Sequence, residues 1–182
     1  MVFPMLGKNT VYYLVSAGII FLLKLAYSYA GNEQLIFLLK PVSQLIGFLT
    51  GSSSVYSPDE GYYLANLNIV IDKSCSGFNF WLISFAMLVF TTLKHFDKHR
   101  QKLLVLPIVF IVSYLLAVFV NTSRIYAAII VQNHWEKFLP EKIHFIVHQS
   151  VGIITSLVFL VIIYYLTNKI LTNKQVQDEK FT

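Results

Sequence analysis

The chain has 182 residues, of which 56% are apolar, and the apolar residues come in blocks close to the ~20 residues that a helix needs to cross a bilayer. Few residues lie outside these blocks, which excludes a second soluble domain and a glycine-rich nucleotide-binding loop. The net charge of +5 comes from basic residues in short loops and at the C-terminus, a pattern typical of membrane orientation rather than of nucleic-acid binding. We therefore predict an all-α polytopic membrane protein with a single integral membrane domain, residues 1–182. It should have about four transmembrane helices, an outer amphipathic helix and a small extracytoplasmic β-hairpin, with membrane lipids and no nucleic acid among its partners.

Residues 10–30 form the first predicted span. This stretch is apolar apart from Lys24 and small polar residues, and Lys8 precedes it. Ser28 and Ala30 weakly resemble a signal-peptidase site, but the stretch is longer than the apolar region of a signal peptide and few charges precede it. We therefore expect a retained membrane helix.

The predicted outer segment, residues 31–77, begins with a second apolar stretch, Glu33–Thr50. Lys40 and Pro41 fall in its middle, where proline removes a backbone donor and kinks a helix. We expect an amphipathic helix lying on the outer surface of the membrane. In the alternative, this stretch crosses the membrane and the N-terminus also lies outside.

The outer segment is also expected to contain a small β-hairpin. Gly51–Ser54 and Ser57–Gly61 are turn signals. After them, Leu67, Ile69 and Ile71 alternate with polar residues, which indicates a short strand. An unpaired strand edge is not tolerated in lipid, so the hairpin should stand above the membrane.

Three further spans are predicted, at residues 78–94, 103–130 and 148–167. The loop 94–102 is the densest basic cluster between spans and should be cytoplasmic, which places the outer segment on the opposite side. The span after it is longer than one crossing needs and carries the polar stretch Asn121–Arg124, where we expect it to end or bend. Gln132–Val147 is expected to be an outer loop that could hold one short helix, and residues 168–182 a cytoplasmic tail.

Cys75 is the only cysteine and cannot form an internal disulfide bond. We expect it at the N-terminus of the second span, where free backbone N–H groups and the helix dipole favour a thiolate. The small residues Ser76 and Gly77 after it would let another backbone or a substrate approach closely. The alternative for a single cysteine is an inert packing residue.

Arg124 lies within an apolar stretch, where a charge costs at least ~2.5 kcal/mol at the bilayer centre. At ~1.5 Å per residue, the rise from Lys102 to Arg124 is about 33 Å, which puts the guanidinium at the outer boundary, the depth expected for Cys75. Asn121 lies on the same helical stripe, and we expect it to orient Arg124. The alternative is an arginine whose charged end merely reaches the interface.

His148 opens the last predicted span at the outer face. A histidine can relay protons near neutral pH, as a cysteine nucleophile requires of its partner. A metal site with His144, four residues earlier, is the alternative. We disfavour it because His95 and His99 repeat that spacing on the cytoplasmic side, and because a flanking glutamate is missing. We therefore predict no metal and no cofactor.

Three different spans thus place Cys75, Arg124 and His148 at the same outer depth. A thiol nucleophile, a cationic stabiliser of an oxyanion and an acid/base group suffice for acyl transfer. The supporting residues are Asn121, Gly77 and Ser76. A second hypothesis is a non-catalytic small membrane transporter or assembly factor in which Arg124 binds an anionic group.

Short motifs around these residues resemble the exosortase/archaeosortase family. They are Lys-Ser-Cys-Ser-Gly at 73–77, Asn-Thr-Ser-Arg-Ile at 121–125 and Val-His-Gln-Ser at 147–150. The resemblance covers roughly Leu35–Tyr165, and it includes Leu-Leu-Lys-Pro at 38–41 and Thr-Gly at 50–51. The chain has fewer predicted spans than many members of the family. In this respect it resembles compact varieties such as the one called exosortase K.

The resemblance implies a multi-pass cysteine transpeptidase or peptidase. Its substrate would be an exported protein with a C-terminal sorting signal, which consists of a short motif, a hydrophobic helix and a basic tail. The implied roles are nucleophile for Cys75, anion stabiliser for Arg124 and acid/base group for His148. It further implies a location in the prokaryotic cell membrane with the active site on the extracytoplasmic face.

Overall fold

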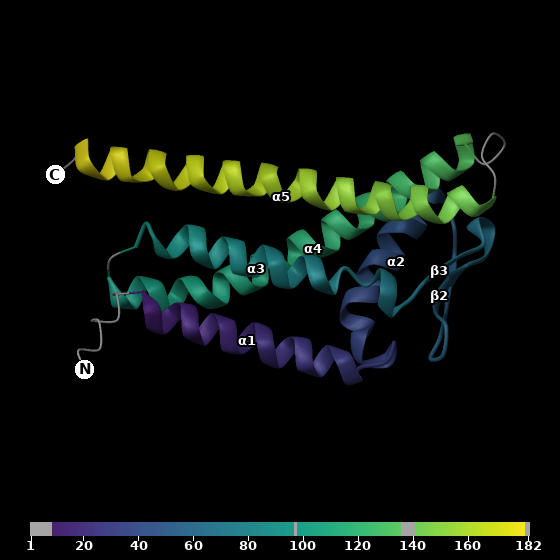
Figure 1. The fold of residues 1–182 in the computed structure, drawn as a ribbon, viewed down its shortest axis with the longest axis horizontal. Coiled ribbons are helices and arrows are strands. Elements are labelled where there is room, and N and C mark those ends of the chain that lie inside the picture. The colour runs from purple at the N-terminus through teal and green to yellow at the C-terminus, as the bar shows by residue number, and fades with distance from the viewer. Residues whose placement is uncertain (1–8, 97, 136–140, 181–182) are drawn as a thin grey trace. The chain divides into compact units, whose positions relative to one another are not determined.

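The computed structural model describes residues 9–96, 98–135 and 141–180, with the side chains of 133–135, 141–148 and 174–180 outside the description. The elements in chain order (Figure 1) are α1 (Thr10–Tyr29), the 3₁₀ helix η1 (Glu33–Leu35), α2 (Ile36–Thr50), β1 (Ser54–Ser57), β2 (Gly61–Leu64), η2 (Ala65–Leu67), β3 (Ile69–Ile71), η3 (Lys73–Cys75), α3 (Phe78–Leu93), α4 (His99–Trp135) and α5 (Glu141–Lys180). These residues divide into two compact units, which are described separately.

Four helical segments of the described chain are long and apolar enough to cross a membrane, and this confirms the predicted all-α polytopic membrane fold. They are Thr10–Tyr29, Lys73–Leu93, His99–Gln132 and Gln149–Asn173. Helix α2 is not among them. Its 15 residues give a length of about 22 Å, short of the ~30 Å hydrocarbon core, so the alternative in which this stretch crosses is not supported.

Helix α2 is amphipathic, as its sequence predicts. Its buried residues are Leu38, Leu39, Val42, Ser43 and Ile46, which recur at the spacing of one helical face. This helix packs on β2 and β1, and Figure 1 shows it beside the sheet. Pro41 lies inside the helix, which ends where Gly51 adopts the left-handed conformation with φ 67° and its N–H bonds to the Gly47 carbonyl.

The outer segment holds a three-stranded antiparallel sheet with the order β1-β2-β3, larger than the predicted hairpin. The turn signal Ser57–Gly61 does join two paired strands, β1 and β2, with Tyr56 opposite Tyr62. The alternating stretch is not one continuous strand, however. Its first part is η2, and Asn68 then adopts a left-handed conformation (φ 51°) that returns the chain, so that only β3 pairs with β2.

Helix α4 runs without interruption through Asn121–Arg124, so of the two predicted outcomes, an end or a bend, the end is wrong. The hydroxyls of Thr122 and Ser123 bond to carbonyls one turn earlier, at 2.8 and 3.0 Å, so these polar side chains are satisfied within the helix. The expected outer loop Gln132–Val147 is also largely helical, because α4 reaches Trp135 and α5 begins at Glu141. With 37 residues, α4 is about 55 Å long and exceeds the hydrocarbon core.

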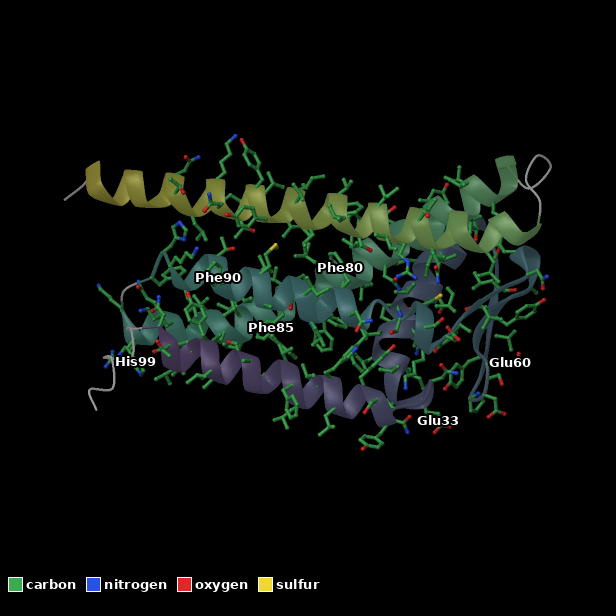
Figure 2. The ribbon with its side chains drawn as sticks, viewed as in Figure 1. Glu33, Glu60, Phe80, Phe85, Phe90 and His99 are labelled. Carbon is green, nitrogen blue, oxygen red and sulfur yellow. The ribbon has the colours of Figure 1, made fainter. Side chains whose placement is uncertain are left out.

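The first unit comprises Met1–Tyr29, Trp81–Leu115 and Leu160–Thr182. Aromatic side chains from α3 and α4 form its core. Trp81 is buried and donates from Nε1 to Ser113 Oγ at 3.1 Å. Phe85, labelled in Figure 2, packs edge-on against Phe110 at a centroid distance of 5.4 Å. This core joins α3 to the first half of α4.

One end of the same unit is tied by polar contacts. The Asn9 side chain donates to the Leu93 carbonyl at 3.0 Å and accepts from Lys102 Nζ at 2.5 Å. The Tyr12 hydroxyl bonds to Nδ1 of His99, which Figure 2 labels. These bonds fasten the start of α1 to the α3–α4 connection, the segment predicted to be cytoplasmic.

The second unit comprises Ala30–Phe80 and Leu116–Phe159. It contains α2, the sheet, η3, the first turn of α3, the second half of α4 and the first part of α5. All six candidate site positions fall within it.

Candidate active site

Cys75 is the last residue of η3, a short turn that follows directly from β3. Asp72 is the N-cap of this turn. Its Oδ1 accepts hydrogen bonds from the Ser74 N–H at 3.0 Å, the Cys75 N–H at 3.3 Å and the Ser74 hydroxyl at 2.6 Å. The nucleophile candidate therefore lies just ahead of α3, at the start of the apolar segment Lys73–Leu93, and a carboxylate organises the backbone around it.

Ser76 and Gly77 join this turn to α3. Ser76 is buried, and its hydroxyl accepts from the Phe78 N–H at 3.4 Å, so it caps the start of the helix. Gly77 has φ 74°, a conformation that L-residues with side chains rarely adopt. A Cβ atom at this position would lie 2.9 Å from both Cβ and Cγ of Asn121. The glycine thus permits a close approach, and the group that approaches is the Asn121 side chain of α4, neither another backbone nor a substrate.

Asn121 binds the cysteine turn directly. Its Nδ2 donates to the Cys75 carbonyl oxygen at 2.5 Å, and the side chain is 2% exposed. Its Oδ1 is buried without a hydrogen-bond partner in the described part of the chain. The contact that the structure gives to Asn121 is with the backbone of the nucleophile candidate, and its expected role of orienting Arg124 stays a prediction.

Arg124 lies one helical turn after Asn121 and contacts α5. A Cβ atom on Gly152 would lie 3.0 Å from Arg124 Nε and 3.3 Å from its Cδ, so the arginine stem passes directly over this glycine. The side chain is half-buried. No described residue forms a hydrogen bond or an ion pair with its guanidinium, so in this part of the chain its charge is not compensated.

His148 lies in α5, one helical turn before Gly152, and its side chain is outside the described residues. The same holds for His144 of the alternative metal site. The contacts of Gly152 with Arg124 nevertheless place this stretch of α5 next to α4. The structure thus joins Cys75, Gly77 and Asn121 through direct contacts. Arg124 follows one helical turn after Asn121, and its contact is with Gly152 of α5.

Two residues that the sequence interpretation did not single out also hold the turn. One is Asp72, whose position before a turn of small polar residues is a capping signal. The other is Asn32, whose Oδ1 accepts from the Lys73 N–H at 2.9 Å and whose Nδ2 donates to the Asp59 carbonyl at 3.0 Å. Nothing in the local sequence indicates these contacts of Asn32, because its partners are distant in the chain.

Comparison with known proteins addresses the family. The model of the family described as transmembrane exosortase matches residues 18–165, which is most of the chain. The chain belongs to this family. No curated protein and no solved structure matches it. The matched region of the exosortase contains every candidate site residue, from Cys75 to His148.

Membership implies, at the level of the family, a membrane-embedded sorting transpeptidase. Exosortases are generally cysteine-type proteases or transpeptidases. This confirms the family resemblance of the three motifs. Together with the four apolar helices, it makes the exosortase a multi-pass membrane protein.

Proposed function

We propose that this exosortase is a cysteine protease or transpeptidase that cleaves a C-terminal sorting signal of exported proteins through a thioester acyl-enzyme. The observation that supports this most directly is the hydrogen bond from Asn121 to the Cys75 carbonyl. It fixes the backbone of the only cysteine of the chain to α4, and the bonded Asn121 lies one turn before an arginine without a described partner. A structural cysteine would not require a neighbouring uncompensated cation.

In the proposed reaction, the Cys75 thiolate attacks the scissile carbonyl carbon and a C–S bond forms. The carbonyl oxygen becomes an oxyanion, and the Arg124 guanidinium donates hydrogen bonds to it. The C–N bond then breaks as His148 gives a proton to the leaving amine. A thioester remains on Cys75. Attack by water releases a free carboxylate, whereas attack by an acceptor amine forms a new amide, and either step returns the thiolate.

The family and the architecture support this substrate class. A protein ending in a short motif, a hydrophobic helix and a basic tail would place its helix in the membrane beside the four spans of the enzyme. The basic loop at 94–102 supports an orientation in which this loop is cytoplasmic. The cysteine turn would then lie on the extracytoplasmic face of the prokaryotic cell membrane, where exported proteins arrive.

Replacement of Cys75 tests the proposal. A candidate substrate of this class is co-expressed with the wild-type chain, with Cys75→Ala or with Cys75→Ser, and its processing is followed by the shift in its mass. We expect both variants to abolish processing. Ser123→Ala is a matched control, because this hydroxyl bonds only within α4 among the described residues. Unchanged processing by Cys75→Ala would remove the thiol from the mechanism.

One observation favours a second candidate function. The uncompensated Arg124 guanidinium could bind an anionic group in a non-catalytic transporter or assembly factor. The two functions differ in their prediction for the thiol. In the second, Arg124→Ala abolishes function while Cys75→Ala leaves it intact, and in the first both variants are inactive.

A further inference from the structure

The backbone N–H groups of the cysteine turn are already bonded within the turn. The Ser74 N–H donates to Asp72 Oδ1 at 3.0 Å. The Cys75 N–H is shared between the Asp72 carbonyl oxygen at 3.0 Å and Oδ1 at 3.3 Å. The Ser76 N–H donates to the Lys73 carbonyl at 3.2 Å. Three successive amides next to the thiol therefore face inward.

This arrangement matters because acyl transfer to a thiol creates an oxyanion. Enzymes often stabilise such a charge with main-chain N–H groups close to the nucleophile. Here the Ser74 amide could do so only by leaving the Asp72 carboxylate, and the Cys75 amide only by leaving both the carboxylate and the main-chain carbonyl of Asp72. Exchanging one charge-assisted bond for another brings little net gain. A side-chain donor is the alternative to these amides. Arg124 carries five N–H groups that no described residue accepts.

On these grounds, and resting on the proposed function, we propose that Asp72 is a positioning residue for the reaction at Cys75. Its carboxylate fixes the turn that carries the thiol by accepting from two amides and from the Ser74 hydroxyl. Because those amides donate to Asp72, they are not available to donate to the oxyanion. The negative charge of the oxyanion must then be stabilised by Arg124.

Ser74 extends the effect of Asp72 to the sulfur atom. Its hydroxyl oxygen lies 2.6 Å from Asp72 Oδ1 and 3.7 Å from Cys75 Sγ. A hydroxyl has one proton, and the shorter, charge-assisted bond to the carboxylate takes it. The sulfur is the second acceptor within reach of the same hydroxyl, and it competes with the carboxylate for that proton. The carboxylate thus holds the backbone of the nucleophile and the hydroxyl beside its sulfur in place.

Two small reagents separate oxyanion stabilisation from other effects on the thiol. Iodoacetamide alkylates the sulfur without forming an oxyanion, whereas p-nitrophenyl acetate acylates it through one and releases p-nitrophenolate. The ratio of the acylation to the alkylation rate constant therefore reports oxyanion stabilisation and cancels changes in thiolate fraction or access. Purified full-length protein is used. Cys75 is the only cysteine, and the Cys75→Ala protein supplies the background rates.

With Asp72 present, Arg124→Gln should lower this ratio about tenfold to a hundredfold. In the Asp72→Ala background, the freed Ser74 amide takes over, and the same substitution should lower it by less than about threefold. In the Asp72→Asn background, the remaining carbonyl oxygen keeps the amides bonded and the full loss should return. A merely structural role of Asp72 would not alter the response to Arg124→Gln.

If Arg124→Gln lowers the ratio equally in the Asp72 and Asp72→Ala backgrounds, the proposed coupling between Asp72 and Arg124 is wrong, while the catalytic role of Arg124 stands. A reduced loss with Asp72→Asn would overturn it as well, and this comparison stands even if Asp72→Ala does not fold. If Arg124→Gln leaves the ratio unchanged beside Asp72, the proposed catalytic role of Arg124 fails together with the coupling. The two failures are therefore distinguishable.

Discussion

The Asn121 side chain donates a 2.5 Å hydrogen bond to the carbonyl oxygen of Cys75, 46 residues earlier in the chain. This bond joins the turn before α3 to the middle of α4. It depends on Gly77, since any side chain there would meet Asn121. The site is therefore built on the approach of two membrane helices, and its geometry should be sensitive to both residues.

Asn121→Ala should weaken both the fold and the activity. The Cys75 carbonyl loses its donor, which costs about 1–3 kcal/mol of the free energy of unfolding when the group stays unsatisfied. The cysteine turn also loses its contact with α4, so substrate processing should fall strongly. Thermal unfolding in detergent and a processing assay measure the two effects. Ser123→Ala, two residues further on, should leave both unchanged, and an equal loss in that control would contradict the role of Asn121.

Gly77→Ala should destabilise the protein more than Gly51→Ala. Both glycines have positive φ, at 74° and 67°, so each substitution carries the ~1–2 kcal/mol cost of left-handed backbone. Only the Cβ at position 77 meets another group, the Asn121 side chain at 2.9 Å, and this overpacking should add about 1–3 kcal/mol. Denaturation of the two variants measures the difference. Equal losses would show that the contact with Asn121 carries no energy.

Gly152→Ala should reduce activity with little loss of stability. The added Cβ would lie 3.0 Å from Arg124 Nε, and the flexible arginine can move aside. Alanine also favours a helix by about 0.8–1 kcal/mol relative to glycine, which offsets the displacement. Processing rates and melting temperatures are measured for this variant and for Gly18→Ala in α1, where nothing lies within 4 Å. Full activity of Gly152→Ala would mean that the position of Arg124 is not critical.

Tyr56 should make folding stability fall at alkaline pH. Burial, and then the charges of Glu33 and Tyr62, raise the pKa of Tyr56 above its ordinary value. As pH rises past the ordinary pKa of tyrosine, the unfolded chain loses the proton before the folded chain does. The contribution of Tyr56 to folding stability is therefore complete below the ordinary pKa, and it is lost as pH rises from there to the raised pKa of the folded state. Tyr56→Phe lacks this contribution. Unfolding of both proteins between about pH 8 and 11 should show a steeper decline for the wild type, and parallel curves would contradict this.

The membrane spans could be predicted because hydropathy is a sum over about 20 residues, which single polar groups do not overturn. The positions at which α4 ends and α5 begins could not be predicted in this way. The stretch Asn121–Arg124 resembles a helix end because its residues are polar, yet Thr122 and Ser123 bond to their own helix and Asn121 bonds to Cys75. The last of these partners is distant in sequence and gives no local signal.

The site was predictable as a set of positions but not as a set of contacts. Cys75 stands out because it is the only cysteine, and Arg124 because a cation is unusual in apolar surroundings. The carboxylate of Asp72 and the bridge made by Asn32 have partners that depend on how the sheet, η3 and the α1–α2 connection meet. Similarly, alternation of apolar residues predicts the strand that contains β3, but it does not encode the left-handed conformation of Asn68 that turns the chain just before β3.

The most direct measurement of the central claim is the mass of the intact protein during turnover with a sorting-signal substrate. The reaction is quenched with acid, and the protein is analysed by mass spectrometry. The account predicts a transient adduct with the mass of the cleaved substrate on the peptide containing Cys75, which hydroxylamine removes and Cys75→Ala abolishes. Processing of the substrate by the Cys75→Ala protein, or an acyl adduct on any other residue, would contradict it.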